Sequence, residues 1–193
     1  MISINNEVYQ NFNPQIWTIS IIVIILFEMS EHREIRIQEA SDRDRSWIKA
    51  FYQERWGSSR VVSRGELHEV ASLSGFIALK ADNRIGLLCY QIKDREFEIV
   101  TLDSLVEGIG VGSALIKKAL ESAQAKDCQR VWLITTNDNT PALHFYQKRG
   151  FKLVAIYPNA LDRSRKLKPE IPQFGLDGIP LRDEIELEFI INR

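Results

Sequence analysis

The order of apolar and polar residues switches repeatedly between strand-like and helix-like periods along this 193-residue chain. Residues 34–38 alternate polar and apolar side chains, which predicts a half-buried strand. Apolar residues between Trp47 and Tyr52 recur at helical spacing, which predicts a helix that begins after Ser41 and ends at Gly57. Ordinary globular patterning therefore begins near residue 35.

Three further segments lead to the middle of the chain. Residues 57–66 show no regular period, and we expect a loop there. Residues 75–80 and 85–92 are strand-like and flank a short polar turn, which predicts a β-hairpin. Residues 96–103 predict a mostly buried strand that contains the carboxylate of Glu98.

A glycine-rich loop then opens a long helical pattern. Gly108, Gly110 and Gly112 stand at alternate positions just after the strand 96–103, and an amphipathic stretch continues to Ala123. Glycines let a backbone turn tightly and approach a ligand, and the free N–H groups of a first helical turn bind anions. The segment therefore predicts a phosphate or pyrophosphate site.

Two other phosphate-binding loops fit this segment less well. A Walker loop needs Lys and then Ser or Thr after its last glycine, whereas Ser113 and Ala114 follow Gly112. The dinucleotide fingerprint needs a glycine at position 113 and lies near the start of a repeated strand–helix–strand unit. The glycine loop here follows several antiparallel-looking strands, so a dinucleotide-binding fold is a poor match.

The second half of the chain continues the alternation. Residues 131–136 and 151–157 are strand-like. Pro141 and Gly150 bound a short helix between them, since proline favours a first turn and glycine a C-cap. Both halves therefore contain a strand followed by a helix.

Two of these segments together resemble the GNAT family of N-acetyltransferases. Glu107-Gly-Ile-Gly-Val-Gly112 resembles the family's coenzyme A pyrophosphate loop, Arg/Gln-x-x-Gly-x-Gly/Ala, although Glu107 departs from that pattern. Asn139-Thr-Pro-Ala-Leu-His-Phe-Tyr-Gln-Lys-Arg-Gly-Phe151 resembles the family's Asn-x-x-Ala-x-x-Phe-Tyr-x-x-x-Gly-Phe segment. The resemblance covers roughly residues 35–191.

The resemblance implies a single α/β (α+β) domain of the GNAT fold over residues 35–193. Its sheet would be mixed but mostly antiparallel, with about six to seven strands and helices on its faces. The strands at 96–103 and 131–136 would splay apart.

The resemblance also implies acetyl-coenzyme A as co-substrate, with no metal. The coenzyme would contact the end of one strand, the glycine loop and the two following helices. The residues expected to bind it are Thr101, Leu102, Asp103, Gly108, Ile109, Gly110, Val111, Gly112, Ser113, Asn139 and Tyr146. Asn139 alternatively serves only as a helix cap.

Tyr146 and Glu98 are the candidate catalytic residues. By resemblance Tyr146 lies near the thioester sulfur, where a hydroxyl stabilises or protonates a departing thiolate; alternatively it packs beside Leu143 at helical spacing. Glu98 is a carboxylate within a largely apolar strand and could take a proton from the amine directly or through water; alternatively it faces solvent.

The expected reaction is direct attack of a primary amine, from a small molecule or peptide, on the acetyl thioester. Two alternatives remain open at this point. One is acetylation of a protein N-terminus or lysine, and the other is a non-catalytic acyl-coenzyme A sensor, which Glu107 makes worth considering.

Two polar segments near the C-terminus have more than one interpretation. Residues 183–189 alternate acidic and apolar side chains, which predicts an edge strand with one face in water, although Glu186 or Glu188 could line an amine pocket. The long connection at 163–172 begins with a run of basic residues. It is a solvated loop, a site for an acidic substrate, or a contact to the coenzyme's 3′-phosphate.

Charge and cysteine content narrow the expected partners. Lys and Arg number 25 against 26 Asp and Glu, so no long-range field attracts nucleic acid or an anionic membrane. The expected partner is the amine substrate, and a homodimer is left open. Cys89 lies in an apolar run and Cys128 in a polar one, which predicts a core residue and a surface thiol in a reducing, cytoplasmic setting.

The N-terminal segment requires a separate interpretation. Residues 16–27 are the most apolar run, but they are shorter than the roughly 20 residues of a membrane span. Residues 1–15 contain no basic residue, unlike a secretory signal. We therefore assign residues 1–34 to an extension outside the domain and expect translation to start at Met29. A peripheral anchor or an extra strand is the alternative.

Overall fold

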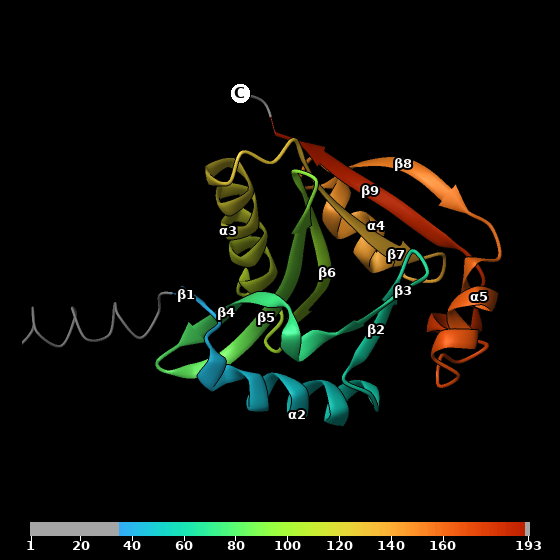
Figure 1. Cartoon of the computed structure of the whole chain (residues 1–193), viewed down its shortest axis with the longest axis horizontal. Helices are drawn as coiled ribbons and strands as arrows, with labels where there is room; N and C mark the ends of the chain where they lie inside the picture. Colours follow the sequence, from blue (N-terminus) through green and yellow to red (C-terminus); the bar gives the residue numbers. More distant parts are fainter. Residues whose placement is uncertain (1–34, 192–193) are drawn as a thin grey trace, which may run out of the picture.

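A seven-stranded mixed sheet with helices on both faces organises the protein in the computed structural model (Figure 1). The structure describes residues 35–191. The apolar run 16–27, the predicted start at Met29 and the boundary after residue 34 lie outside the described residues. The strand order is β1-β4-β5-β6-β7-β9-β8, which agrees with the predicted α/β class and strand number.

The elements follow the predicted order, with three additions. The additions are a two-stranded hairpin, a C-terminal helix and short 3₁₀ turns. The sheet strands are β1 Arg36–Glu39, β4 Ser74–Lys80, β5 Asn83–Lys93, β6 Glu96–Ser104, β7 Arg130–Thr136, β8 Lys152–Tyr157 and β9 Glu184–Ile190. The other elements are β2 Arg60–Ser63, β3 Glu66–Glu69, α2 Arg45–Trp56, α3 Val111–Ala125, α4 Thr140–Gln147, α5 Ala160–Leu167 and the turns Asp42–Asp44, Val70–Ser72 and Leu176–Gly178.

The two faces of the sheet are covered by different helices. Helices α3 and α4 cover one face, where Leu115 and Ala119 pack on sheet residues such as Leu133. Helix α2 covers the other face, where Ile48 and Tyr52 pack against β4 and β5. Burying an apolar stripe of each helix in this way is the main stabilising contribution to such a layered domain.

The predicted loop at 57–66 is wrong, because most of it forms the β2–β3 hairpin. Arg64 and Gly65 make its two-residue turn with φ values of 47° and 78°, as a primed hairpin turn requires. Only Val61 and Val62 are apolar in β2, so the sequence carries no strand period. Packing of Val61 against the core under α2 supplies what the local pattern lacks.

The prediction of an edge strand at 183–189 is also wrong. Strand β9 lies between β7 and β8 and pairs with both. Its alternation is real, but Arg64 of the β2–β3 turn contacts Glu186, Ser164 of α5 donates to Glu184, and the two glutamates are each only 3% exposed. An alternating strand can therefore bury both faces when its polar face meets other polar groups.

The two cysteines are both buried. Cys89 lies in the core under α2, as predicted. Cys128 is only 4% exposed, so the prediction of a surface thiol is wrong. Its backbone N–H donates to Ala123 O just after α3, and this contact turns the thiol into the core.

Strands β6 and β7 pair for only part of their length. Their parallel register runs from Glu96 opposite Arg130 to Ile99 opposite Leu133 and stops there. Beyond it β6 continues against β5, and β7 continues against β9. The predicted splay is therefore confirmed, and it leaves two strand edges facing each other without ladder hydrogen bonds.

No helix within residues 35–191 is both long and apolar enough to span a membrane.

Candidate functional site

The glycine loop ends at the N-terminus of α3, close to the end of β6. Gly108 and Gly110 adopt φ values of 78° and 90°, which favour glycine over residues with a side chain. The first helical N–H group to donate within α3 is that of Ala114, to Gly110 O at 3.0 Å. The preceding N–H groups of Val111 to Ser113 lie before that ladder and are free to bind an anion.

Gly112 has a different task from the other two glycines. A Cβ atom built on it would lie 2.9 Å from Phe145 Cζ. The glycine therefore lets α3 approach α4 closely, and it is needed for helix packing rather than for a turn. This contact joins the two segments that carry the family resemblance.

A cation reaches the head of α3 from the end of α4. The guanidinium of Arg149 donates to Ser113 Oγ, and it also donates to Phe145 O at 2.6 Å. Its carbon atom lies 3.5 Å from the centre of the Phe145 ring, and burial lowers the pKa of Arg149. The sequence does not predict this arrangement, because nothing in the spacing of Ser113 and Arg149 shows that they meet.

The opening between β6 and β7 contains a cavity of about 370 Å³, here called the splay cavity. Its walls are residues 99–102 of β6, residues 133–135 of β7, and Asn139, Pro141, Ala142, Phe145 and Tyr146 at the start of α4 and on it. Consecutive residues of each strand line the cavity, and consecutive side chains of a strand point to opposite faces of the sheet. The cavity therefore lies between the two strands rather than on one face of the sheet. Backbone N–H and C=O groups of two unpaired edges are available along it.

Tyr146 lies deep in this region. Its side chain is 7% exposed, and its ring makes edge contacts with Phe145 and Phe151 at 5.1 and 5.5 Å. Burial, with a smaller contribution from the charge of Asp103, raises the pKa of the Tyr146 hydroxyl. At neutral pH the hydroxyl therefore keeps its proton and can donate it. Tyr146 packs in the core and also lines the cavity.

The expected cofactor residues at the end of β6 differ in what they can offer. Leu102 and Thr101 line the splay cavity, but the Oγ1 of Thr101 is buried with no hydrogen-bond partner in the described residues. Asp103 points instead toward α2, where it accepts a hydrogen bond from Tyr52 at 2.6 Å and lies 3.3 Å from Arg55. Asp103 can therefore contribute only its backbone to a ligand between the strands.

Asn139 caps α4. Its side-chain oxygen accepts from the backbone N–H of Ala142 at 3.2 Å, which satisfies one of the free donors of the first turn. The same residue lines the splay cavity. Capping uses the amide oxygen and leaves the NH₂ group available to a ligand.

Glu98 lies on the far side of the same pair of strands. It is 4% exposed, so the solvent-facing alternative is wrong. Its two oxygens accept from Ser63 Oγ and from Gln91 Nε2, both at 2.6 Å. The carboxylate is therefore held in one orientation by two neutral donors, and Ser63 comes from the hairpin that the sequence did not predict.

A second cavity of about 410 Å³ opens beside Glu98, here called the acidic cavity. It is lined by Ser63, Arg64, Glu66, Gln91, Lys93, Asp94, Glu96, Glu98 and Trp132. Glu98 and Ile99 are consecutive in β6, as Trp132 and Leu133 are in β7, and one member of each pair lines each cavity. The two cavities therefore lie on either side of these two pairs of neighbouring residues.

A charged network borders the acidic cavity. Arg130 donates to Glu96, Glu186 and Glu188 at 2.8 to 2.9 Å, and these hydrogen bonds raise its pKa, with that to Glu96 the largest cause. The hydroxyl of Tyr157 also donates to Glu186 at 2.6 Å and has a raised pKa for that reason. Of the two candidate pocket residues on β9, Glu186 is buried in this network and Glu188 lies at its edge.

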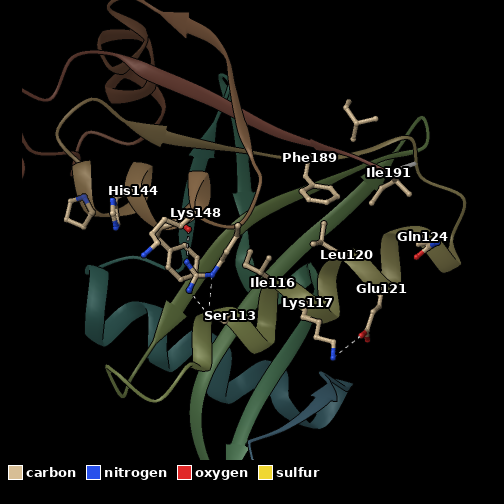
Figure 2. Close-up of a pocket in the computed structure, with 14 residues that line it drawn as sticks. Ser113, Ile116, Lys117, Leu120, Glu121, Gln124, His144, Lys148, Phe189 and Ile191 are labelled. Atoms are coloured by element: carbon tan, nitrogen blue, oxygen red, sulfur yellow. Dashed lines mark hydrogen bonds and ion pairs between the residues drawn. The ribbon is translucent and has the colours of Figure 1, made fainter. Parts of the chain in front are cut away.

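A groove of about 1070 Å³ lies between α3 and α4 (Figure 2). Ser113, His144 and Lys148 lie at one end of it, and Leu120, Phe189 and Ile191 lie toward the other. Lys148 and Arg149 therefore place two basic side chains at the end that contains Ser113.

The basic residues at 163–168 do not reach that loop. Part of the segment forms α5, which lies at the opposite end of the molecule from α3 (Figure 1). Arg165 donates to the carbonyl oxygens of Pro172 and Leu181, and Lys168 donates to Arg60 O at 2.8 Å. These bonds attach α5 to the chain around it, so the interpretation as a solvated loop is wrong for these two residues.

Within residues 35–191, no group of three or more His, Cys, Asp and Glu side chains is placed to hold a metal ion.

Comparison with known proteins agrees with this geometry. Residues 37–151 match the model of the Acetyltransferase (GNAT) family. The uncharacterized protein YdhI of Bacillus subtilis (strain 168) is 41% identical over 143 residues, which cover 74% of this chain and 89% of YdhI.

Solved structures show the same fold at low sequence identity. An IAA acetyltransferase from Bacillus cereus ATCC 14579 superposes with a TM-score of 0.63 at 18% identity, covering 81% of this chain and 99% of that one. A Bacillus subtilis acetyltransferase in complex with CoA superposes with a TM-score of 0.59 at 20% identity, covering 82% and 100%. The predicted fold is therefore confirmed.

Proposed function

Because this chain belongs to the GNAT acetyltransferase family, we propose that it transfers an acetyl group from acetyl-coenzyme A to a primary amine of a small molecule or peptide. The observation that carries the proposal is the splay cavity, which places two unpaired strand edges and Tyr146 beside the glycine loop. A protein of the same fold has been solved with CoA, which supports a coenzyme in this place.

The residues around the splay cavity fit acetyl-coenzyme A in order along the ligand. The free N–H groups at the head of α3 suit the pyrophosphate, and Arg149 adds a positive charge beside them. The open edge of β6 from Val100 to Ser104 suits the amide groups of the pantetheine arm, as an added strand would. The NH₂ group of Asn139 supplies one further donor.

The chemical step needs one proton donor and one proton acceptor. The amine nitrogen attacks the thioester carbonyl carbon, so that a C–N bond forms, the C–S bond breaks and the sulfur leaves as a thiolate. Tyr146 donates its proton, or a hydrogen bond, to that sulfur. Glu98 accepts the proton that the nitrogen loses, directly or through a water molecule.

The two cavities give these groups access from opposite directions. In this proposal the coenzyme arrives through the splay cavity, and the amine arrives through the acidic cavity that Glu98 lines. Ser63 and Gln91 position the Glu98 carboxylate one residue before the last pair of β6 and β7, next to the opening.

Arg149 also bears on the alternative of a non-catalytic sensor. Glu107 is exposed in the glycine loop, whereas the guanidinium of Arg149 is bonded at the head of α3. A cation is therefore available to the phosphates although position 107 is acidic. This favours an enzyme with ordinary coenzyme binding.

The test is a screen of primary amines with acetyl-coenzyme A in which thiol release is measured, repeated with two variants. We expect Tyr146→Phe to lower kcat about 100-fold with little change in the KM of acetyl-coenzyme A. We expect Glu98→Gln to lower kcat/KM for the amine by a similar factor at neutral pH.

A matched control separates the site from the core. Tyr90→Phe removes a hydroxyl from a tyrosine of the same core that does not line the splay cavity. It should retain normal kcat. Normal turnover by both Tyr146→Phe and Glu98→Gln would refute these two assignments, and the absence of acetyl transfer to every amine would refute the proposed function.

A further inference from the structure

The guanidinium of Arg64 occupies a site made for a cation. Its carbon lies 5.3 Å from the centre of the Trp132 ring and 5.4 Å from that of Tyr157, and one nitrogen lies 3.7 Å from Glu186 Oε2. Two aromatic faces with a carboxylate form a well-suited receptor for an organic cation. In the free protein this receptor holds a side chain of the protein itself.

Arg64 reaches this site from a strained and accessible position. It is a non-glycine residue with a φ of 47° in the two-residue turn between β2 and β3. Its side chain remains 43% exposed, while Trp132 and Glu186 are only 8% and 3% exposed. The receptor is therefore a fixed part of the sheet, and its occupant is carried by a short turn at the surface.

The charges around the receptor leave an excess of carboxylates. Three glutamates surround Arg130, whereas Glu98 and Glu184 have no basic group within 4 Å among the described residues. Burial raises the pKa of Glu184. The five carboxylates on this face are Glu96, Glu98, Glu184, Glu186 and Glu188, and the guanidiniums near them are those of Arg64, Arg130 and Arg163. A cationic ligand would reduce this imbalance, and an anionic one would increase it.

The positions of Glu98 and Glu186 indicate how far apart the two cationic groups of a substrate would lie. The two glutamates lie on β6 and β9, which are separated by β7 alone, so their strands are about 10 Å apart. Glu98 lines the acidic cavity and directly precedes Ile99, which lines the splay cavity where the acetyl group is expected. Glu186 belongs to the cation receptor. An amine held between the two carboxylates needs a second positive group several ångströms from the nitrogen that reacts, because each nitrogen lies about 3 Å inside the carboxylate that binds it.

We propose that the acceptor is an extended amine that carries a second cationic group, and that the receptor of Trp132, Tyr157 and Glu186 binds this group after displacing the guanidinium of Arg64. This inference rests on the proposed acetyl transfer and adds its substrate class. The second cation fixes the position of the substrate, and the reacting amine lies toward Glu98.

The first experiment compares three amines of equal length on the full chain. Pentylamine has a neutral tail, cadaverine a cationic tail and aminovaleric acid an anionic tail. We expect kcat/KM for cadaverine to exceed that for pentylamine about tenfold or more, with aminovaleric acid the poorest. Equal values for cadaverine and pentylamine, or a preference for aminovaleric acid, overturn the proposal, and the latter would make Arg64 an anion-binding residue.

Two variants test the receptor itself. Glu186→Gln should lower the ratio of kcat/KM for cadaverine to that for pentylamine severalfold, because it removes the carboxylate. Arg64→Asn should raise the same ratio, because asparagine tolerates the left-handed backbone but leaves the receptor free. The control Arg36→Gln changes an exposed arginine on β1 and should leave the ratio unchanged. A fall in the ratio with Arg64→Asn would contradict displacement.

A binding measurement separates this inference from the proposed function. Calorimetric titration of the coenzyme A-bound protein with each amine requires no chemistry. Tighter binding of cadaverine than of pentylamine, with no acetyl transfer to any amine, would sink the acetyltransferase proposal and leave the cation receptor standing. Acetylation of all three amines, with equal binding affinities, would support the acetyltransferase proposal and refute the cation receptor.

Discussion

On the side of the β6–β7 opening where we propose that the coenzyme binds, here called the coenzyme side, the site consists of a glycine loop, two strand edges and one helix start. The opposite side, here called the acidic side, consists of side chains from many separate segments. The coenzyme side presents mainly backbone N–H and C=O groups, with Tyr146 and Asn139 added from α4. The acidic side combines the β2–β3 turn with β6, β7, β8 and β9 through residues such as Arg64 and Glu186.

The difference has a physical origin. Backbone groups are the same in every residue, so a site that uses them needs only the correct chain path and a few glycines. A site made of side chains needs particular residues at particular points of several strands. The coenzyme side should therefore respond to changes of shape, and the acidic side to changes of charge.

The largest effect is expected on the acidic side, from Arg130→Met. The substitution keeps much of the volume but leaves Glu96, Glu186 and Glu188 without their shared cation. We expect a loss of about 3 kcal/mol in the free energy of unfolding, measured by urea denaturation, since Arg130 and Glu186 are largely buried. Adding Glu186→Gln should recover part of this loss. A change below about 1 kcal/mol would show that the network contributes little.

The next effect tests shape on the coenzyme side, through Gly112→Val. The new side chain would meet Phe145 at a Cβ distance of 2.9 Å, so α3 and α4 must move apart. We expect about 2 kcal/mol of destabilisation and weaker coenzyme A binding by calorimetry. Gly112→Val combined with Phe145→Leu should bind more tightly than the single variant. An unchanged affinity for Gly112→Val would mean that this packing does not shape the loop.

Asn139 offers a finer comparison, because one side chain has two tasks. Asn139→Ala should cost about 1 kcal/mol of stability through loss of the α4 cap. Asn139→Asp keeps a capping oxygen and loses the NH₂ group, so stability should be retained while the KM for acetyl-coenzyme A rises. Equal KM values for wild type and Asn139→Asp would restrict this residue to capping.

The smallest effect is the pH dependence of stability that Asp103 causes. Its carboxylate lies between β6 and α2, where it contacts Tyr52 and Arg55. Burial raises its pKa in the folded protein, although hydrogen bonds from Tyr52 and the charge of Arg55 oppose this. The folded state therefore holds the proton over a range in which the unfolded chain has lost it. Stability from this group is full below the unfolded value of about 4 and falls as pH rises.

Asp103→Asn removes this dependence. The stability of wild type relative to the variant should fall as pH rises above about 4 in parallel urea titrations. The lowered pKa values of Asp44 and Asp183 act in the opposite direction, but both proteins share them. A relative stability that rises with pH would show that hydrogen bonding outweighs burial at Asp103.

Much of the fold and of the coenzyme side could be predicted from the sequence, and much of the acidic side could not. The hairpin of β4 and β5, the strand at 96–103 and the helix after the glycine loop were predicted from their periods. The hairpin at 60–69 was missed, because two short strands of mixed polarity carry no period and are stabilised by packing under α2. Ser63 and Arg64 consequently had no predicted place in a site.

The glutamates of β9 show a second feature that the sequence pattern alone could not predict, namely their environment in the folded protein. Their alternation correctly predicted a strand with one polar face, but water was the wrong environment for Glu184 and Glu186. Polarity alone cannot say whether a carboxylate meets solvent or a guanidinium, because both satisfy it. Strand order decides this, and strand order depends on contacts between residues more than 50 positions apart, such as Arg130 and Glu186.

The sequence by itself determined the order of strands and helices, the glycine loop and the family, because these follow from local periods, turn residues and short motifs. The tertiary structure alone decided that Arg149 meets Ser113, that Glu98 is held by Ser63, and that Arg64 lies over Trp132. These pairs join segments whose separation along the chain carries no signal. Only the folded sheet brings them within the few ångströms over which hydrogen bonds and cation–π contacts act.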